Sequence, residues 1–323
     1  MSEFSLIDLL KQRNQIARKD VSQGIGDDCA CVSVPDGYEL AITVDTLIEG
    51  VHFPVGTSAH AIGFKSLAVN LSDLAAMGAE PAWVSLAISL PKDDAEWLNS
   101  FAEGFFALAQ TLNVQLIGGD TTRGPLSITI QAHGFIPRGQ AITRGGAKPG
   151  DYICVTGTLG EPGLELLRLG GKPQTHTALN RLNYPEPRVA AGMALRGVAS
   201  AAIDISDGLI ADLGHILDAS GVGARLTLED IPLPQSLRED QDPAKMLELA
   251  LTAGDDYELC FTIPERQIDT VNALQYQLNL PIKHIGNIQE QPGLRMHRQD
   301  GVPLEISAGG FDHFAENRHG WDK

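Results

Sequence analysis

The chain carries, at residues 68–78, the stretch AVNLSDLAAMG, part of a run at 58–78 that is apolar around most of a helical wheel. This pattern predicts a buried helix that ends at its last glycine, a common helix stop. Ser66, Asn70 and Asp73 follow one another at spacings of four and three, so they share one narrow polar stripe. An unpaired buried charge is costly, so Asp73 needs a partner, which is a metal ion, a basic side chain or water.

On both sides of this helix the hydrophobic pattern alternates between strands and helices. In the first half it predicts a second helix at 94–112 and strands at 38–44, 83–90, 115–117 and 126–136. A polar, glycine-rich linker follows at 138–150. The second half predicts helices at 163–169, 188–198, 209–219, 243–251 and 264–278, strands at 151–156, 201–205, 224–228, 257–263 and 282–288, and a hairpin at 294–306.

The chain is strongly acidic: of its 323 residues, 24 are Lys or Arg and 41 are Asp or Glu, a net charge of −17. This charge argues against binding to nucleic acid or to an anionic membrane, because both require a basic surface. With 43% hydrophobic residues the chain is expected to be globular, and no run of 18 apolar residues predicts a membrane span. No signal-peptide pattern opens the chain and its four cysteines lack metal-ligand spacing, so we expect a reduced, cytoplasmic protein.

Several aspartates end or interrupt apolar runs. Asp28 closes a glycine-rich turn, and Asp120 follows an apolar stretch. Asp45 and Asp204 are each expected at the end of an apolar strand, where a sheet can aim carboxylates at one point. Hard divalent cations take oxygen ligands, and Mg²⁺ commonly combines carboxylates with substrate phosphates. The pattern predicts a site for several magnesium ions, although each aspartate alone also fits a turn or a surface position.

The common phosphate-binding and catalytic motifs are missing. The only Gly-Lys pair precedes a proline, which excludes a Walker loop, and no third glycine completes a dinucleotide fingerprint. An EF-hand loop and a Gly-x-Ser-x-Gly elbow are also absent from the sequence. Arg123 and Arg144 lie in polar loops, where each either clamps a phosphate or is solvated. His52 is a lone histidine, a kind that is more often structural than catalytic.

Eight short motifs together resemble the thiamine-monophosphate kinase family. They are GIGDD (24–28), TVDT (43–46), GVHF (50–53), AVNLSDLAAMG (68–78), GGDTT (118–122), DISDGL (204–209), DYEL (256–259) and GFDHF (310–314). Their order along almost the whole chain makes the resemblance specific. The family belongs to a superfamily with aminoimidazole ribonucleotide synthetase, selenophosphate synthetase and a hydrogenase maturation protein.

The resemblance implies an α+β fold of two domains. Residues 1–138 would form a mixed sheet with helices that binds Mg²⁺ and ATP and pairs across a homodimer into a barrel. Residues 139–323 would form an α/β-sandwich-like domain that completes the nucleotide and substrate site. The implied reaction is Mg²⁺-assisted, in-line transfer of the γ-phosphate of ATP, the co-substrate, to thiamine monophosphate, which gives thiamine diphosphate. The implied cofactor is a group of several Mg²⁺ ions.

The resemblance also implies roles for the residues at matching positions. Positions that match metal contacts are Asp28, Thr43, Val44 (through its backbone carbonyl), Asp45, Asp73, Asp120, Asp204 and Asp207. Positions that match nucleotide contacts are Gly119, Asp120, Arg144 and Ser206, and those that match substrate contacts are His52, Asp255 and Phe311. Of these residues, Asp45, Asp120 and Arg144 are expected to act in catalysis.

Two of the substrate positions depart from the family pattern. Asp255 stands where the family usually has Glu, so its carboxylate is one methylene closer to the backbone. Phe311 stands where the family commonly has Trp or Tyr, a change that keeps stacking and removes any hydrogen bond from the ring. The thiazolium cation of the substrate suits both residues, by charge and by a cation–π contact.

Other functions remain as alternatives from the sequence. Aminoimidazole ribonucleotide synthetase is a weaker match, and the characteristic cysteines of the hydrogenase maturation proteins and selenophosphate synthetases are missing. From other classes, a two-metal phosphohydrolase and a non-catalytic acidic binding protein both fit the aspartates. ADP release that depends on an acceptor separates a kinase from a hydrolase.

Overall fold

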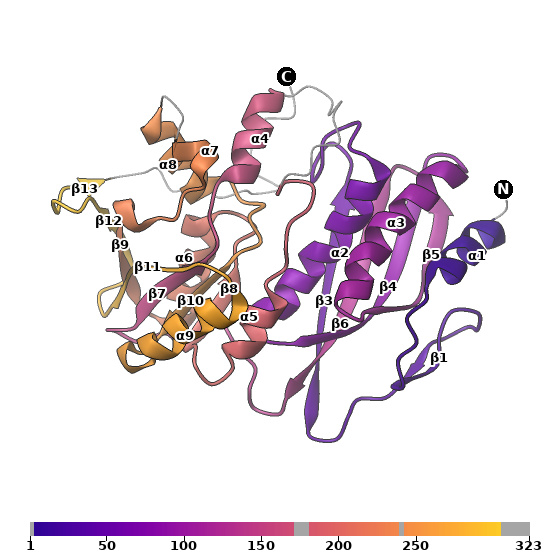
Figure 1. The fold of residues 1–323 in the computed structure, drawn as a ribbon, viewed down its shortest axis with the longest axis horizontal. Helices are drawn as coiled ribbons and strands as arrows, with labels where there is room; N and C mark the ends of the chain where they lie inside the picture. The colour runs from indigo at the N-terminus through magenta and orange to yellow at the C-terminus, as the bar shows by residue number, and fades with distance from the viewer. Residues whose placement is uncertain (1–2, 171–180, 239–241, 305–323) are drawn as a thin grey trace.

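The structure, a computed structural model, describes residues 3–170, 181–238 and 242–304. Two sheets form its two halves, and helices from each half lie between them (Figure 1). The two-domain α+β fold with mixed sheets agrees with the sequence prediction. Within the described ranges, no helix is both long and apolar enough to cross a membrane.

The N-terminal half is built on a four-stranded sheet in the order β3-β6-β4-β5. Its strands are β3 (Tyr38–Ile48), β6 (Ser127–Pro137), β4 (Glu80–Leu90) and β5 (Gln115–Arg123). The β4–β5 pair is parallel and the other two pairs are antiparallel, so the sheet is mixed. A helix α1 (Glu3–Arg13) and a small hairpin of β1 (Val21–Gln23) and β2 (Cys31–Val32) lie beyond β5 (Figure 1).

Two helices, α2 (Ala59–Ala76) and α3 (Ala95–Thr111), lie side by side across one face of this sheet (Figure 1). Each begins at a polar N-cap: Ser58 accepts a hydrogen bond from Ala61 N, and Asp94 accepts one from Trp97 N. The helices cross at Gly63 and Gly104, where a Cβ atom would lie within 2.0 Å of a backbone oxygen of the other helix. Only glycine permits so close an approach of the two backbones.

The C-terminal half is built on a seven-stranded sheet in the order β13-β12-β9-β11-β7-β10-β8. Its strands are β7 (Tyr152–Thr156), β8 (Ala201–Asp204), β9 (Gly223–Thr227), β10 (Leu259–Ile263), β11 (Ile282–Gln289), β12 (Gly293–His297) and β13 (Pro303–Leu304). Its helices are α4 (Glu161–Leu169), α5 (Val189–Ala194), α6 (Leu209–Ser220), α7 (Gln235–Arg238), α8 (Pro243–Thr252) and α9 (Ile268–Leu278). All strand pairs except β12–β9 are antiparallel.

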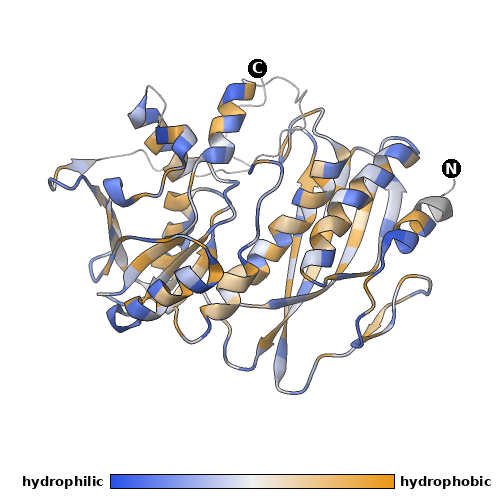
Figure 2. Cartoon of the chain, in the orientation of Figure 1, coloured by the Kyte–Doolittle hydropathy of each residue, from blue (hydrophilic) through white to orange (hydrophobic). Residues whose placement is uncertain are grey.

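Helix α2 lies at the centre of the molecule and is buried along nearly its whole length, as the sequence predicted. One hydrophobic core contains α2, α3, the inner face of the four-stranded sheet and residues of β7, β8 and β10 such as Phe261. A second core lies between the seven-stranded sheet and α6. Figure 2 shows the hydrophobic residues along α2 and on the strands behind it. A residue on α2 can therefore contact both halves.

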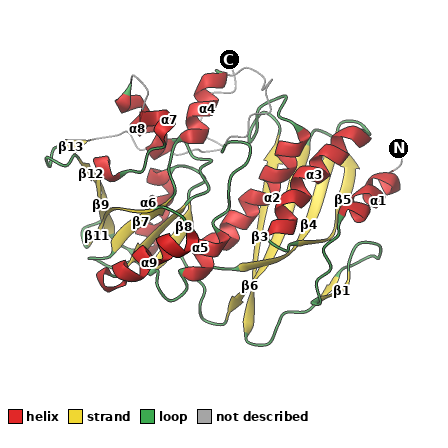
Figure 3. Ribbon diagram, in the orientation of Figure 1, coloured by secondary structure: helices red, strands yellow, loops and turns green. Residues whose placement is uncertain are grey.

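The predicted helices and strands are present, and the differences concern mainly their ends (Figure 3). Asp204 is the last residue of β8, as expected, but the strand-end prediction is wrong for Asp45, and the strand predicted at 115–117 is too short, so that Asp120 lies within the observed strand. Asp45 lies inside β3, because the ladder with β6 continues to the Ile48–Ser127 pair. Asp120 lies inside β5, because the parallel ladder with β4 continues to Arg123. Helix α5 is shorter than the predicted 188–198.

Candidate active site

Three carboxylates from three different elements lie close together where the two halves meet. Asp45 is on β3, Asp73 is on α2 and Asp204 ends β8. Thr43 Oγ1 donates a hydrogen bond of 2.5 Å to Asp73 Oδ2. From the preceding residue of α2, Ser72 Oγ donates one of 2.7 Å to the buried Asp204. The helix thus connects a strand of each sheet through two successive residues.

Burial raises the pKa of each of these carboxylates, and repulsion by neighbouring aspartates adds to the effect for Asp45 and Asp204. The pKa of Asp45 is raised to about 7 by burial and then by Asp73, with a further contribution from Asp207. The pKa of Asp73 is raised by burial, against the hydrogen bond from Thr43 and the positive charge of Arg144. The pKa of Asp204 lies well above its ordinary value, because the group is buried and then because Asp73 is near. We call Asp45, Asp73, Asp204 and Asp207 the aspartate cluster. Arg144 is the basic side chain whose charge acts on Asp73.

A second acidic residue supports the loop that follows β8. Asp212, in the first turn of α6, is buried and its Oδ2 accepts hydrogen bonds of 3.0 Å from Ser206 N and Asp207 N. Burial and then the neighbouring Asp207 raise its pKa to about 7. The sequence analysis missed Asp212, although its place in the first turn of a predicted helix is typical of a residue that binds free backbone N–H groups.

The loop at 254–257 packs closely against the segment that follows β8. Asp255 N donates to Ser206 O at 2.8 Å, and a Cβ atom on Gly254 would lie 2.3 Å from that oxygen. Asp255 and Tyr257 have φ values of 61° and 51°, which L-residues adopt only under strain. The pKa of Tyr257 lies well above its ordinary value because of burial and then because of Asp255, Asp45 and Asp204. This loop therefore lies beside the aspartate cluster.

Two predicted substrate positions meet at a lysine that the sequence analysis missed. Lys65 Nζ lies 2.9 Å from Asp255 Oδ1 and donates a hydrogen bond of 3.2 Å to the backbone oxygen of His52. The ring of His52 accepts a hydrogen bond from Ile48 N through Nδ1. Lys65 is the only lysine in α2, a helix otherwise rich in apolar residues, and that is the signal that could have identified it.

Asp120 and Gly119 lie on β5, three strands away from Asp45. Strand spacing of about 4.8 Å puts β5 about 14 Å from β3 across the sheet. The register places Asp120 in one row with Ala87, Thr129 and Thr46, on the face that α2 and α3 leave open. Gly119 approaches β4 so closely that a Cβ atom would lie 1.8 Å from Leu86 O.

The remaining predicted residues are dispersed. Asp28 is exposed on the loop between β1 and β2, and Arg144 is exposed on the linker but close enough to affect the pKa of Asp73. Val44 is 60% exposed on the open face of β3. Phe311 lies outside the described residues. Within one chain, the described structure thus brings together the residues of β3, α2, β8 and the two adjoining loops, and leaves Asp28 and Asp120 on other surfaces.

The aspartate cluster fits a hard divalent cation. Its donors are carboxylates and the hydroxyl of Thr43, and Asp73 raises the pKa of both Asp45 and Asp204. Among the described residues, no three acidic, histidine or cysteine side chains form a ready-made metal site. Mg²⁺ commonly takes one or two protein carboxylates and completes its shell with water and substrate phosphates, so it does not require three.

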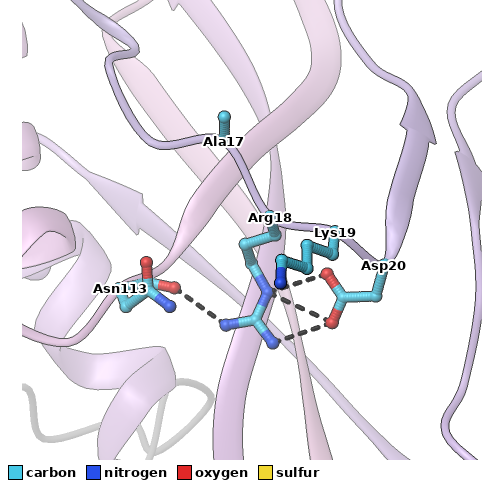
Figure 4. Close-up of a pocket in the computed structure, with 5 residues that line it drawn as sticks. All are labelled: Ala17, Arg18, Lys19, Asp20 and Asn113. Carbon is cyan, nitrogen blue, oxygen red and sulfur yellow. Dashed lines mark hydrogen bonds and ion pairs between the residues drawn. The ribbon is translucent and has the colours of Figure 1, made fainter.

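A pocket elsewhere on the surface does not compete with this site. It is lined by Ala17, Arg18, Lys19, Asp20 and Asn113, and Figure 4 shows the side chains. The guanidinium of Arg18 is bound to Asp20 at 2.8 Å and to the backbone oxygen of Asn113 at 3.0 Å. The charges of Arg18 and Asp20 in this pocket therefore neutralise each other.

Two family models match the chain, one to each half. The model of the AIR synthase related protein N-terminal domain matches residues 26–136, and that of the C-terminal domain matches residues 148–299. Among curated proteins, thiamine-monophosphate kinase of Salmonella typhimurium is 47% identical over 320 residues, which cover 97% of this chain and 98% of that protein.

Two solved structures are similar over nearly the whole chain. The crystal structure of thiamine-monophosphate kinase from Stenotrophomonas maltophilia is 46% identical with a TM-score of 0.86, and the match covers 94% of this chain and 98% of that one. The structure of AaThiL complexed with AMPPCP and TMP is 29% identical with a TM-score of 0.74, over 97% of both chains. The similarity thus extends through both halves and the junction between them.

Proposed function

The chain belongs to the thiamine-monophosphate kinase family, and on that premise we propose that it transfers the γ-phosphate of ATP directly to thiamine monophosphate. The products are thiamine diphosphate and ADP. The observation that carries this proposal is an aspartate cluster that lies beside the Asp255 loop, where a metal-bound nucleotide and a cationic acceptor can both be accommodated. The relative with bound AMPPCP and TMP supports the same pair of substrates.

We assign the metal positions to Asp28, Thr43, Val44, Asp45, Asp73, Asp120, Asp204 and Asp207. When bound, Mg²⁺ neutralises phosphate charge and orients donor and acceptor for in-line transfer. Thr43 holds the carboxylate of Asp73 in place, and Ser72 does the same for Asp204. Asp28 and Asp120 remain in this assignment as ligands from outside the cluster, since Asp120 lies on the open face of the sheet.

The other residues bind and orient the two substrates. We assign Gly119, Asp120, Arg144 and Ser206 to the nucleotide, with Arg144 supplying positive charge beside Asp73. His52, Asp255 and Phe311 are assigned to the acceptor. The acceptor phosphate has a second pKa of about 6, so it is largely ionised at neutral pH and transfer requires no general base. Asp45, Asp120 and Arg144 then contribute by positioning and by charge.

We also propose a homodimer in which the four-stranded sheets of two copies join into a barrel. The support is the edge strand β3, whose open face carries exposed apolar side chains, Ile42 at 56% and Val44 at 60%. Exposed apolar residues along an edge strand are uncommon in monomers, because they promote aggregation, and they are typical of an interface. In this proposal residues 1–138 form the dimerisation and nucleotide domain, and residues 139–323 complete the nucleotide and substrate site. We also propose that the enzyme works in the cytoplasm, where ATP is supplied.

The test is an incubation of the purified chain with ATP, Mg²⁺ and thiamine monophosphate, followed by chromatography of the thiamine compounds. We expect thiamine diphosphate only with the monophosphate as acceptor and none with free thiamine. Release of ADP without thiamine diphosphate would contradict the proposal and would favour a phosphohydrolase. Absence of any effect of AMPPCP on the melting temperature would favour a binding protein without nucleotide chemistry.

A further inference from the structure

We propose that Lys65 is the positioning residue of the acceptor side: it holds the Asp255 carboxylate and the His52 loop in one fixed arrangement on helix α2. The inference rests on the proposed function and goes beyond it, because it identifies what sets the acceptor-binding geometry. Lys65 acts through Asp255 and the backbone of His52, and its effect is expected on the binding of thiamine monophosphate and not on that of ATP.

The first support is the burial of a charged side chain at a junction. Lys65 is only 3% exposed, although it carries an ammonium group. Its Nζ lies 2.9 Å from Asp255 Oδ1 and donates at 3.2 Å to the carbonyl of His52. One contact reaches the C-terminal half and the other reaches the segment between β3 and α2. An apolar residue would fill the same space without the desolvation of a charge, so packing alone does not account for a lysine.

The second support is the state of the Asp255 carboxylate. Lys65 and Tyr257 Oη both contact its Oδ1, the latter at 3.1 Å. In the part of the chain that the structure describes, Oδ2 has no hydrogen-bond partner, and the side chain is 24% exposed. One oxygen is therefore held by the protein while the other remains available to a cationic ligand. The thiazolium ring of the acceptor is such a ligand.

The third support is the position of Lys65 relative to the aspartate cluster. Asp73 follows Lys65 on the same helix after eight residues, and a rise of 1.5 Å per residue separates them by about 12 Å along the axis. A single rigid helix thus sets the distance between the acceptor's cation-binding group and the site of phosphate chemistry. Because α2 is packed against both sheets, this distance is fixed before substrate binds.

A double-mutant cycle with Lys65→Met and Asp255→Asn tests the inference, with steady-state rates measured against both substrates. We expect Lys65→Met to raise the KM for thiamine monophosphate about tenfold or more, the effect of losing one charge-assisted contact. The KM for ATP should stay within about twofold of that of the unmodified enzyme. In the Lys65→Met background, Asp255→Asn should raise the acceptor KM by less than it does in the unmodified enzyme. The reason is that both substitutions disrupt the same contact between Lys65 and Asp255.

Lys92→Met is the matched control, since Lys92 is exposed and its ammonium group pairs with the nearby Asp94 at 3.0 Å. An unchanged acceptor KM in Lys65→Met would overturn the inference, as would independent effects of the two substitutions or equal rises in both KM values. If the methionine variant does not fold, the variants Lys65→Gln and Lys65→Arg replace it. Their affinity for thiamine monophosphate is then measured by titration calorimetry with AMPPCP present. Weakened binding in the glutamine variant with recovery in the arginine variant supports the role, and equal binding in both refutes it.

The outcome also separates this inference from the proposed function. If the unmodified enzyme forms thiamine diphosphate and Lys65→Met has an unchanged acceptor KM, only the role of Lys65 is refuted. If the unmodified enzyme forms no thiamine diphosphate from thiamine monophosphate and ATP, the proposed function itself fails.

Discussion

At the scale of single residues, the account depends on carboxylates that cannot all be ionised without added positive charge. Asp45 and Asp73 hydrogen-bond to each other, and the pKa of Asp45 is raised to about 7 by burial and by Asp73. Like charges this close to each other retain a proton unless a cation intervenes. The site is therefore organised for charge that arrives with the nucleotide.

Replacing Asp45 by Asn should impair activity far more than stability. We expect turnover to fall by about 100-fold, as is typical when a group that stabilises transition-state charge is removed. The melting temperature of the ligand-free protein should be unchanged or higher, because the substitution removes repulsion from Asp73. The measurements are kcat at limiting Mg²⁺ and a thermal melt, with Asp269→Asn on the exposed surface of α9 as control. Full activity of the Asp45 variant would contradict the metal assignment.

Asp256 gives a prediction about pH. It is buried, its Oδ1 accepts a hydrogen bond of 2.8 Å from Gly160 N, and burial holds its pKa well above the ordinary 3.8. The folded state thus keeps a proton that the unfolded state loses, so the contribution of this group to stability is complete below about pH 4 and declines as pH rises toward the folded pKa. Asp256→Asn should reduce the loss of unfolding free energy between pH 5 and pH 7.5.

Urea titrations of both proteins at the two pH values measure this difference. Asp269→Asn serves again as control and should leave the pH dependence unchanged. Identical pH dependence in the Asp256 variant and the unmodified protein would refute the assignment of a protonated, buried carboxyl group.

At the scale of elements, α2 explains both the stability and the site. It contacts α3 through Gly63 and Gly104, the Asp255 loop through Lys65, and β8 through Ser72. The apolar pattern of residues 58–78 was sufficient to predict this buried helix and the need of Asp73 for a partner. It marks Lys65 as an unusual residue in an apolar helix but does not give its partners Asp255 and His52, of which Asp255 is far away in sequence.

The strand boundaries show a second limit of prediction from sequence. Thr43 to Ile48 alternate between the covered and the open face, but Asp45 interrupted the apolar run and the predicted strand ended at Val44. In β5, two glycines and Asp120 have low strand propensity, which predicts an earlier end of the strand. The backbone hydrogen bonds to β4 outweigh this low propensity, and the strand continues to Arg123. The faces on which Asp45 and Asp120 lie depend on pairing with β6 and β4, which the local sequence does not contain.

The α2–α3 crossing can be tested with a single methyl group. Gly104→Ala should lower the free energy of unfolding by about 1–3 kcal/mol or more, because its Cβ atom would lie 1.8 Å from His60 O. Gly214→Ala in the middle of α6 is the control; nothing lies within 4 Å of its Cβ position, so the gain in helix propensity should stabilise by up to about 1 kcal/mol. Denaturant titrations measure both. Equal effects of the two substitutions would contradict the close helix contact.

At the scale of the whole molecule, the two halves form one site because the core that contains α2 includes residues of both sheets. The resemblance of ordered motifs anticipated the two-domain α+β fold and the kinase family, and the full-length similarity to relatives agrees. The described chain leaves Asp120 and the apolar side chains of β3 on the open face of the sheet. The proposed dimer therefore bears on the proposed position of Asp120 as well as on the exposed apolar side chains of β3.

The proposed dimer predicts a specific effect at the edge strand. Ile42→Lys on the open face of β3 should shift the molecular mass in solution from dimer toward monomer, because a charge in an apolar interface is costly. Light scattering after size-exclusion chromatography measures the mass. Tyr276→Lys is the control, since Tyr276 is 83% exposed on α9, away from this sheet. A monomer in the unmodified protein, or a dimer that tolerates Ile42→Lys, would contradict the barrel.

The most direct test of the central claim follows the γ-phosphate itself. The unmodified enzyme, ATP labelled at the γ-position, Mg²⁺ and thiamine monophosphate are incubated, and the label is quantified in thiamine diphosphate and in inorganic phosphate. Direct transfer predicts one labelled thiamine diphosphate for each ADP and almost no labelled inorganic phosphate. Label that appears in inorganic phosphate, with ADP formed at the same rate whether or not the acceptor is present, would contradict the account.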